Sequence, residues 1–258
     1  MSRYFLTLEY DGAGFCGWQR QANGLAVQEV LEQAVHAFTR EAVTAHAAGR
    51  TDAGVHALAM VAHVDLARPH PANTVRNALN HHLRPHPVAV IEARAVGHEL
   101  HARFSAERRH YLYRIRNRRA PLALDLHRVW LVARDLDAEL MHAAGQALVG
   151  RHDFTSFRAA ECQASSPVKT LDRLLVERSG DEVRLTVTAR SFLHHQVRNI
   201  VGSLVLVGKG DWRVGDVAKA LAAKDRAAAG PTAPAAGLYF AGVDYPGFTT
   251  WRDAAPRG

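Results

Sequence analysis

The sequence has little cysteine and no long hydrophobic run. Its two cysteines, Cys16 and Cys162, are too few for a disulfide framework or a cysteine-based zinc site. No apolar stretch has the length that a bilayer-spanning helix needs. The first residues, MSRYFLTLEYDG, lack the apolar core and cleavage site of a signal peptide. We therefore expect a cytoplasmic protein that neither spans nor enters a membrane.

What the sequence does contain is typical of a globular protein with a basic surface. Its 258 residues, 48% of them hydrophobic, suffice for one large domain or two small ones with a buried core. Lysine and arginine number 32 against 25 acidic residues, which gives a net charge of +7 with the histidines neutral. This excess favours a polyanionic partner, and nucleic acid ahead of an anionic membrane.

Hydrophobic periodicity predicts both strands and helices along the whole chain. Apolar residues at every second position predict strands at 3–10, 60–66, 87–96, 111–116, 171–178, 183–190 and 238–244. Helical spacing predicts helices at 26–40, 73–83, 137–149, 193–207 and 214–223. In these elements we expect Phe5 on a polar strand face, Asn73 as a helix cap and Leu140 facing inward. Strands and helices do not alternate regularly, which favours an α+β fold in two related lobes with a boundary near residue 104.

The stretch YDGAGFCGW at 10–18 contains the glycine spacing of a dinucleotide-binding loop, at Gly12, Gly14 and Gly17. That motif requires a helix that opens directly on its last glycine. Here polar and turn-forming residues follow, and the first credible helix begins only after Gly24. Asp11 would also repel a phosphate. We interpret these glycines as a turn that leaves a strand.

The stretch AGRTDAGVHA at 48–57 is the most unusual in the sequence. It places Arg50, Thr51, Asp52 and His56 among glycines, between two strand-like segments. Such glycines allow a tight turn that holds short polar side chains at a surface. For an isolated Asp-Ala-Gly, the simpler interpretation is an Asx-turn in which Asp52 only binds local backbone.

This loop resembles the signature of the tRNA pseudouridine synthase A family, and the resemblance covers about 230 residues. It includes YDG and GWQRQ near the N-terminus, HARFSA at 101–106 with YLY at 111–113, DFTSFR at 153–158, FLHHQVRN at 192–199 and TAPAAGL at 232–238. Six motifs in the same order are far more specific than a single match. Gln196 and Phe240 stand where the family more often has methionine and leucine, and neither position carries the chemistry.

The resemblance implies a pseudouridine synthase fold of two ferredoxin-like (RRM-like) lobes, with a mixed, mainly antiparallel sheet and a central active-site cleft. Residues 1–104 would form the lobe with the aspartate loop, and residues 105–258 the lobe with the tyrosine and arginine motifs. It also implies a homodimer that isomerises uridine to pseudouridine at positions 38, 39 and 40 in the anticodon arm of tRNA, without a metal or a cofactor.

The resemblance further implies a role for four residues. Asp52 would be the catalytic residue, Tyr111 would stack on the flipped base, Arg198 would pair with Asp52, and Arg50 would contact phosphate or fill the gap that the base leaves. Asp52 could attack C6 of uracil, attack C1′, or remove a ribose proton. An arginine run near Tyr111 could track phosphates or be a solvated face; it comprises Arg108, Arg109, Arg114, Arg116, Arg118 and Arg119.

Other enzyme classes fit the residues less well. A uracil methyltransferase needs a cysteine nucleophile and a cofactor loop, and neither cysteine has that context. A zinc deaminase needs a C-x-x-C motif, which is absent from the sequence. A metal hydrolase could use the histidines at 81–82, 98, 101 or 194–195, but His98 and His101 lack the i,i+4 spacing of H-E-x-x-H. The remaining alternative is a catalytically silent RNA-binding protein on the same scaffold.

Overall fold

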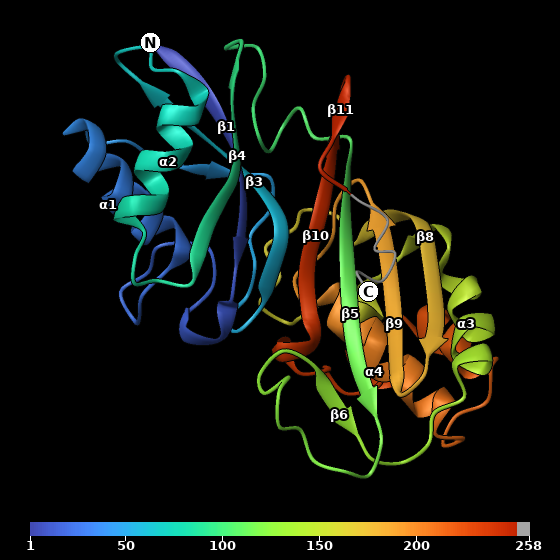
Figure 1. Ribbon diagram of the computed structural model, residues 1–258. Coiled ribbons are helices and arrows are strands. Elements are labelled where there is room, and N and C mark those ends of the chain that lie inside the picture. The colour runs from blue at the N-terminus through green and yellow to red at the C-terminus, as the bar shows by residue number, and fades with distance from the viewer. Residues whose placement is uncertain (252–258) are drawn as a thin grey trace. The chain divides into compact units, whose positions relative to one another are not determined.

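The chain forms two compact units, seen here in a computed structural model that describes residues 1–251 (Figure 1). Of the described residues, the first unit contains 1–109 and 239–251, and the second contains His110–Leu238. This division differs from the one expected at residue 104. The last long strand, which the sequence assigned to the second lobe, pairs with a strand of the first.

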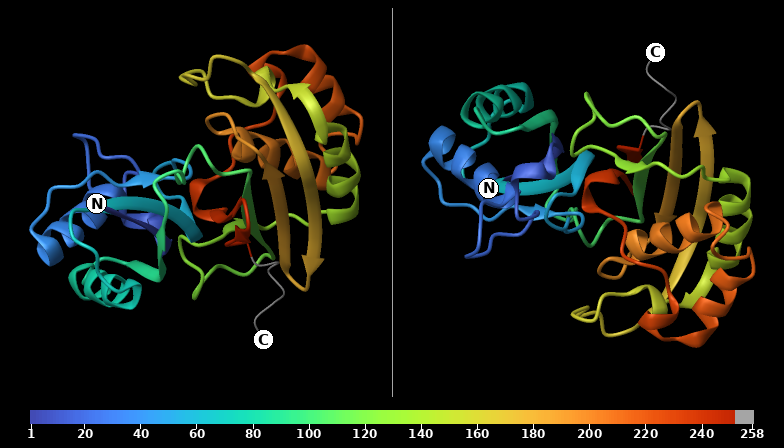
Figure 2. Two further views of the ribbon diagram at one scale, coloured as in Figure 1. Left: turned by 90° about the horizontal axis from the view of Figure 1, so that it is seen from above. Right: turned by 90° about the horizontal axis from the view of Figure 1, so that it is seen from below.

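The first unit is a sheet with two helices on one side of it (Figures 1 and 2). Its elements are β1 (Ser2–Tyr10), α1 (Val27–Thr39), β2 (His46–Ala47), β3 (His56–Leu66), α2 (Ala72–His82), β4 (Val88–Val96), β10 (Leu238–Tyr245) and β11 (Phe248–Thr249). The strand order is β4-β1-β3-β10, with β2 also paired to β3 and β11 to β10. All of these pairs are antiparallel except β10 with β3.

Apolar side chains of β1 and α1 form the core of the first unit. Leu6 and Leu8 on the strand and Val27 and Leu31 on the helix are almost fully buried, as their spacing predicts. Phe5, expected on the polar face, is also buried because Tyr245 and Phe248 pack against its ring. The expectation for Phe5 was therefore wrong: aromatic residues from the far end of the chain cover that part of the face.

His63 gives the first unit a predicted sensitivity to acid. It is 1% exposed in β3, and burial, followed by the positive charges of Arg3, His101 and His46, lowers its pKa to about 4. The unfolded chain therefore takes up a proton between about pH 6.5 and 4 that the folded chain does not. We expect the free energy of unfolding to fall by up to about 3 kcal/mol as the pH drops through this window.

Urea unfolding between pH 7 and 4 tests this expectation. His63→Gln keeps an acceptor for the backbone N–H of Ala102, which donates to His63 Nδ1 over 3.2 Å, but it cannot take up a proton. The variant should lose less stability than the parent chain over the same pH range. Equal pH dependence in the two proteins would show that His63 is not responsible.

The second unit is a sheet with three helices. Its elements are β5 (Arg108–Asn117), β6 (Trp130–Val132), α3 (Ala138–Gly145), β7 (Gly150–Asp153), β8 (Val168–Ser179), β9 (Glu182–Ala189), α4 (Gln196–Gly208) and α5 (Asp216–Ala223). The strand order is β5-β9-β8-β7, and β6 pairs with β5 in parallel. The hairpin of β8 and β9 is antiparallel and was expected from the turn at 179–182. Together the two units confirm the α+β class with mixed, mainly antiparallel strands.

Two details of the helices correct the sequence expectations. In α3 it is Met141 that is fully buried, whereas Leu140 is 43% exposed, so the inward face is rotated by one residue. In α2 the helix begins at Ala72, directly after Pro71, and Asn73 lies inside it rather than capping it. Proline is well suited to the start of a helix because its fixed φ and missing N–H cost nothing there. Within residues 1–251, no helix is both long enough and apolar enough to cross a membrane.

Candidate functional site

Asp52 opens a tight turn immediately before β3. The backbone N–H of Val55 donates to the carbonyl oxygen of Asp52 over 3.1 Å, which closes the turn. Thr51 precedes it, and its hydroxyl lies 2.8 Å from the hydroxyl of Tyr10 in a buried contact. The Asp52 side chain is half-buried. The turn thus presents a carboxylate from a backbone that β1 and β3 hold in place.

The glycines of the 10–18 stretch pack directly against this turn. Gly17 has a φ of +109°, and a Cβ placed on it would lie 2.5 Å from the carbonyl oxygen of Thr51. A Cβ on Gly12 would lie 2.0 Å from the carbonyl oxygen of Val55. The N–H of Trp18 donates to Thr51 O over 3.0 Å. These glycines let the backbone of the 10–18 loop approach the backbone of the Asp52 turn. The helix α1 begins only at Val27, ten residues after Gly17, so the loop is not a dinucleotide site.

His56 joins the glycine loop to β10. Its Nδ1 accepts the backbone N–H of Gly12 over 3.0 Å, and it is 2% exposed. Its ring stacks on that of Tyr239, with centroids 4.8 Å apart and an interplanar angle of 26°. His56 is part of the motif that the sequence singled out, and its place here is structural support of the Asp52 turn.

Arg50 lies on the same loop, two residues before Asp52. Its side chain is exposed. Over residues 1–251 it takes part in no hydrogen bond or ion pair of the folded chain. The predicted contact of Arg50 with RNA phosphate therefore requires no internal interaction to be broken.

The second unit carries Tyr111 and Arg198. Tyr111 lies on β5, is 9% exposed and meets the edge of the Phe192 ring, with centroids 5.0 Å apart and the planes at 86°. Arg198 lies in the first turn of α4. Phe192 belongs to a motif that the sequence identified, but its contact with Tyr111 was not foreseen.

The TAPAAGL segment at 232–238 holds Arg198 in place. Arg198 Nε donates to the carbonyl oxygen of Ala233 over 2.8 Å, and the N–H of Ala233 donates back to Arg198 O over 3.1 Å. Tyr113 anchors the same segment by donating its hydroxyl to Pro234 O over 2.7 Å. Burial raises the pKa of Tyr113, so this hydroxyl stays protonated and the anchor is retained at any ordinary pH.

Asn199 ends the FLHHQVRN motif at 192–199, and its structural role was not predicted from the sequence. It is fully buried next to Arg198, and its amide nitrogen donates to Phe157 O over 2.9 Å. Its side-chain oxygen accepts from Thr232 Oγ1 over 2.7 Å and from Arg226 over 3.2 Å. A polar residue at a buried position of an apolar helix was the signal that could have identified it.

Most arginines of the run around Tyr111 are engaged by carboxylates or carbonyl groups of the protein itself, which neither the phosphate-track nor the solvated-face interpretation foresaw. Arg114 and Arg184 both bind Glu182; burial opposes ionisation of this carboxylate, but the two guanidinium groups hold its pKa at about 2. Arg116 bridges Asp181 and Asp125. The others engaged in this way are Arg118, which pairs with Asp181, and the buried Arg109, which donates to backbone carbonyls. Of the six arginines, Arg108 and Arg119 are the exposed ones.

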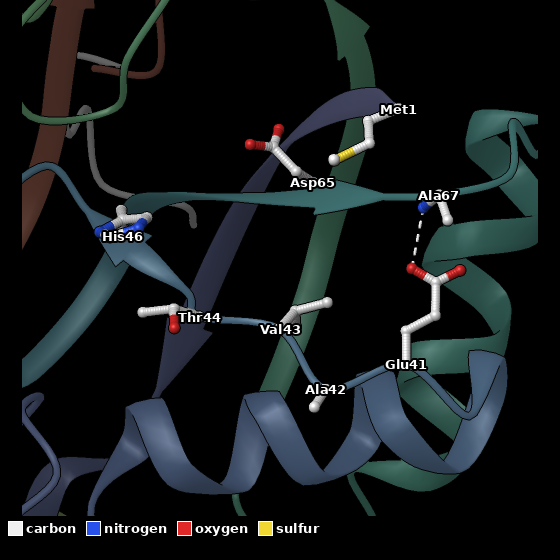
Figure 3. A pocket seen from close by; sticks show the side chains of 8 residues that line it. All are labelled: Met1, Glu41, Ala42, Val43, Thr44, His46, Asp65 and Ala67. Carbon is white, nitrogen blue, oxygen red and sulfur yellow. Dashed lines mark hydrogen bonds between the residues drawn. The ribbon is translucent and has the colours of Figure 1, made fainter.

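A pocket of about 390 Å³ in the first unit is separate from these residues. Figure 3 shows it between the end of β3 and the segment that follows α1. Its two carboxylates are already engaged, because Glu41 accepts the N–H of Ala67 and Asp65 pairs with Arg3. None of the four predicted site residues lines it.

Comparisons with known proteins identify the family to which the chain belongs. A family model described as tRNA pseudouridine synthase matches residues 7–105 and 144–246. A protein named tRNA pseudouridine synthase A from Rhodospirillum centenum is 65% identical over 240 residues, which cover 93% of this chain and 98% of that protein. Relatives with the same name from Paramagnetospirillum magneticum and Maricaulis maris are 61% and 60% identical, over 95% and 96% of this chain and 96% and 99% of their own lengths. This chain therefore belongs to the tRNA pseudouridine synthase family.

Proposed function

We propose that Asp52 supplies the catalytic carboxylate with which this chain isomerises uridine to pseudouridine at positions 38, 39 and 40 of tRNA. Family membership makes the chain an isomerase that acts on uridine in tRNA. The observation that carries the assignment of Asp52 is the construction of its turn. The backbone that presents the carboxylate is fixed by the close packing of Gly12 and Gly17 against it, and by the contact between the hydroxyl groups of Tyr10 and Thr51.

The reaction needs no redox chemistry. The bond between N1 of uracil and C1′ of ribose breaks, the base rotates, and C5 bonds to C1′ while the C5 proton is lost to solvent. The product has the same atoms as the substrate once N1 gains a proton. An ionised Asp52 can add to C6, add to C1′ or remove a ribose proton, and each route uses a carboxylate held near the flipped base.

The other predicted residues have complementary roles in this proposal. Tyr111 offers an aromatic ring to the flipped base, and Phe192 restricts that ring from its edge. Arg198 supplies a positive charge for Asp52, and its anchor at Ala233 sets its position. The exposed Arg50 binds a phosphate beside the target uridine.

The partner in the proposal is the anticodon arm of tRNA in the cytoplasm, bound by a homodimer. A charge of +7 per chain becomes +14 per dimer, twice the value of one chain, and such a surface attracts a folded polyanion. Light scattering of the purified protein tests the dimer. A monomer that modifies tRNA at the full rate would contradict this part of the proposal and leave the isomerase in place.

Position mapping tests the substrate assignment. Unmodified tRNA transcripts with uridine at only one of positions 38, 39 or 40 are incubated with the protein, and pseudouridine is located by carbodiimide labelling and primer extension. We expect a stop at each of the three positions and none in a transcript that lacks all three uridines. Modification elsewhere in the tRNA would show that a different uridine is the substrate. Tight binding without any modification would favour the catalytically silent RNA-binding protein.

A further inference from the structure

The loop between β4 and β5 exposes a large aromatic side chain. Phe104 is 75% exposed, although it lies in the HARFSA motif. Single exposed apolar residues are common and need no explanation by themselves. Phe104 differs because the loop around it is firmly held, so the ring is displayed in one place.

Hydrogen bonds fix the backbone on both sides of Phe104. Ala102 donates its N–H to the buried His63 and accepts from the Tyr245 hydroxyl over 2.6 Å. The buried Arg109 donates to the carbonyl oxygen of Arg103. The loop therefore has partners on β3, β10 and β5, which limits its freedom to move Phe104 into the protein.

The ring of Phe104 is the outer member of an aromatic series. Its centroid lies 4.4 Å from that of His101, and His101 lies 5.6 Å from His46. Burial, and then the charge of His46, lowers the pKa of His101, so this imidazole is a neutral aromatic ring at neutral pH. The guanidinium carbon of Arg103 lies 5.8 Å from the Phe104 ring centroid and adds a positive charge beside the exposed ring.

The loop of this exposed pair is linked to the loop of the Asp52 turn within the same unit. Arg109 donates to the carbonyl oxygen of Ala48 over 3.0 Å as well as to that of Arg103, so one guanidinium joins the two loops. Ala48 precedes Asp52 by four residues, a separation of roughly 14 Å at most. Arg109 therefore ties the loop that carries Phe104 to the loop that carries Asp52.

We propose that Phe104 and Arg103 form a second contact for the RNA, in which Phe104 stacks on an unpaired base near the target uridine and Arg103 contacts its phosphate. This inference rests on the proposed function. An aromatic ring beside a guanidinium group is the chemistry with which proteins bind unstacked bases. The buried centre of a protein–protein interface is depleted of charged residues, whereas the exposed residues close to Phe104 in sequence are charged: Arg103, Glu107 and Arg108.

Binding of unmodified tRNA by the full chain tests this contact. Phe104→Ala should weaken the affinity roughly 5- to 150-fold, the range expected for one base stacked on an aromatic ring. Phe104→Trp should bind within about twofold of the parent chain because it keeps a flat ring. Leu124→Ala is the matched control: Leu124 is 93% exposed on another loop, and its replacement should leave the affinity unchanged.

A fluorescent base gives a readout that does not depend on turnover. A tRNA with 2-aminopurine beside the target position should lose fluorescence on binding the parent chain and the Phe104→Trp variant, and lose less with Phe104→Ala. Equal affinity and equal quenching for Phe104→Ala and the parent chain would overturn the inference. So would a Phe104→Ala protein that changes from dimer to monomer yet binds tRNA normally. Failure of the parent chain to modify tRNA would instead count against the proposed function.

Discussion

Replacement of Asp52 by asparagine is expected to lower the turnover of uridine by about 1,000-fold or more while the protein still folds and binds tRNA. Asparagine keeps the size of the side chain but can neither attack carbon nor accept a proton as a carboxylate does. The backbone contacts of the turn, such as Val55 N–H to Asp52 O, do not involve the side chain and are retained. The loss should therefore appear in kcat rather than in affinity.

Chromatographic analysis of nucleosides after digestion of the tRNA measures this loss. Asp137→Asn is the control, since the carboxylate of Asp137 caps α3 by accepting the N–H of Leu140 over 2.9 Å, and asparagine caps a helix about as well as aspartate. We expect that control to retain most of the turnover. A normal rate for Asp52→Asn would place the catalytic group elsewhere in the chain.

Replacement of Gly17 by alanine is expected to disturb the same site through the backbone. The new Cβ would lie 2.5 Å from Thr51 O, on a residue whose φ of +109° is unfavourable for any L side chain. One of the two loops must move, and Thr51 directly precedes Asp52. We expect a fall of about 2 kcal/mol or more in the free energy of unfolding and at least a tenfold loss of turnover.

Gly14→Ala provides the control within the same motif. A Cβ on Gly14 meets no atom within 4 Å, so this variant should keep the stability and activity of the parent chain. Urea unfolding and initial rates of modification measure both effects. If Gly17→Ala behaved like Gly14→Ala, the close packing of the two loops would not be what positions Asp52.

Hydrophobic periodicity predicts a helix or strand correctly when the element's own residue pattern determines which of its side chains are buried. The apolar positions 197, 200 and 204 of α4 are buried as their helical spacing predicts. Short strands such as β2 and β6 were not expected, because two or three residues carry too little pattern to distinguish a strand from a loop. The start of α2 was misplaced because either Pro71 or Asn73 could precede a helix.

Contacts between distant segments account for the other differences. The parallel pairing of Tyr239 with His56 joins residues 183 positions apart, and no local pattern encodes it. The burial of Phe5 has the same origin, since its cover comes from Tyr245 and Phe248. The arginines of β5 illustrate a further point: charge in a sequence does not reveal which carboxylates, here Glu182 above all, will neutralise it.

The candidate site could be predicted because its motifs are dense and ordered, not because its geometry follows from the residues. AGRTDAGVHA indicated the turn at Asp52, and the structure adds that Gly12 and Gly17 of another stretch support it. The structural roles of Asn199 and Arg109 were not predicted, because their partners are backbone carbonyls or distant side chains. The roles of Asp52, Tyr111, Arg198 and Arg50 in the reaction stay predictions.

Release of tritium from tRNA labelled at C5 of uridine tests the central claim most directly, because formation of the new C5–C1′ bond expels the hydrogen at that carbon. The purified chain is incubated with unmodified, labelled tRNA in buffer that contains a chelator and no nucleotide or redox cofactor. The account predicts that tritium appears in water in proportion to the uridines at positions 38 to 40, and that Asp52→Asn releases none above background. No release by the parent chain, or undiminished release by Asp52→Asn, would contradict it.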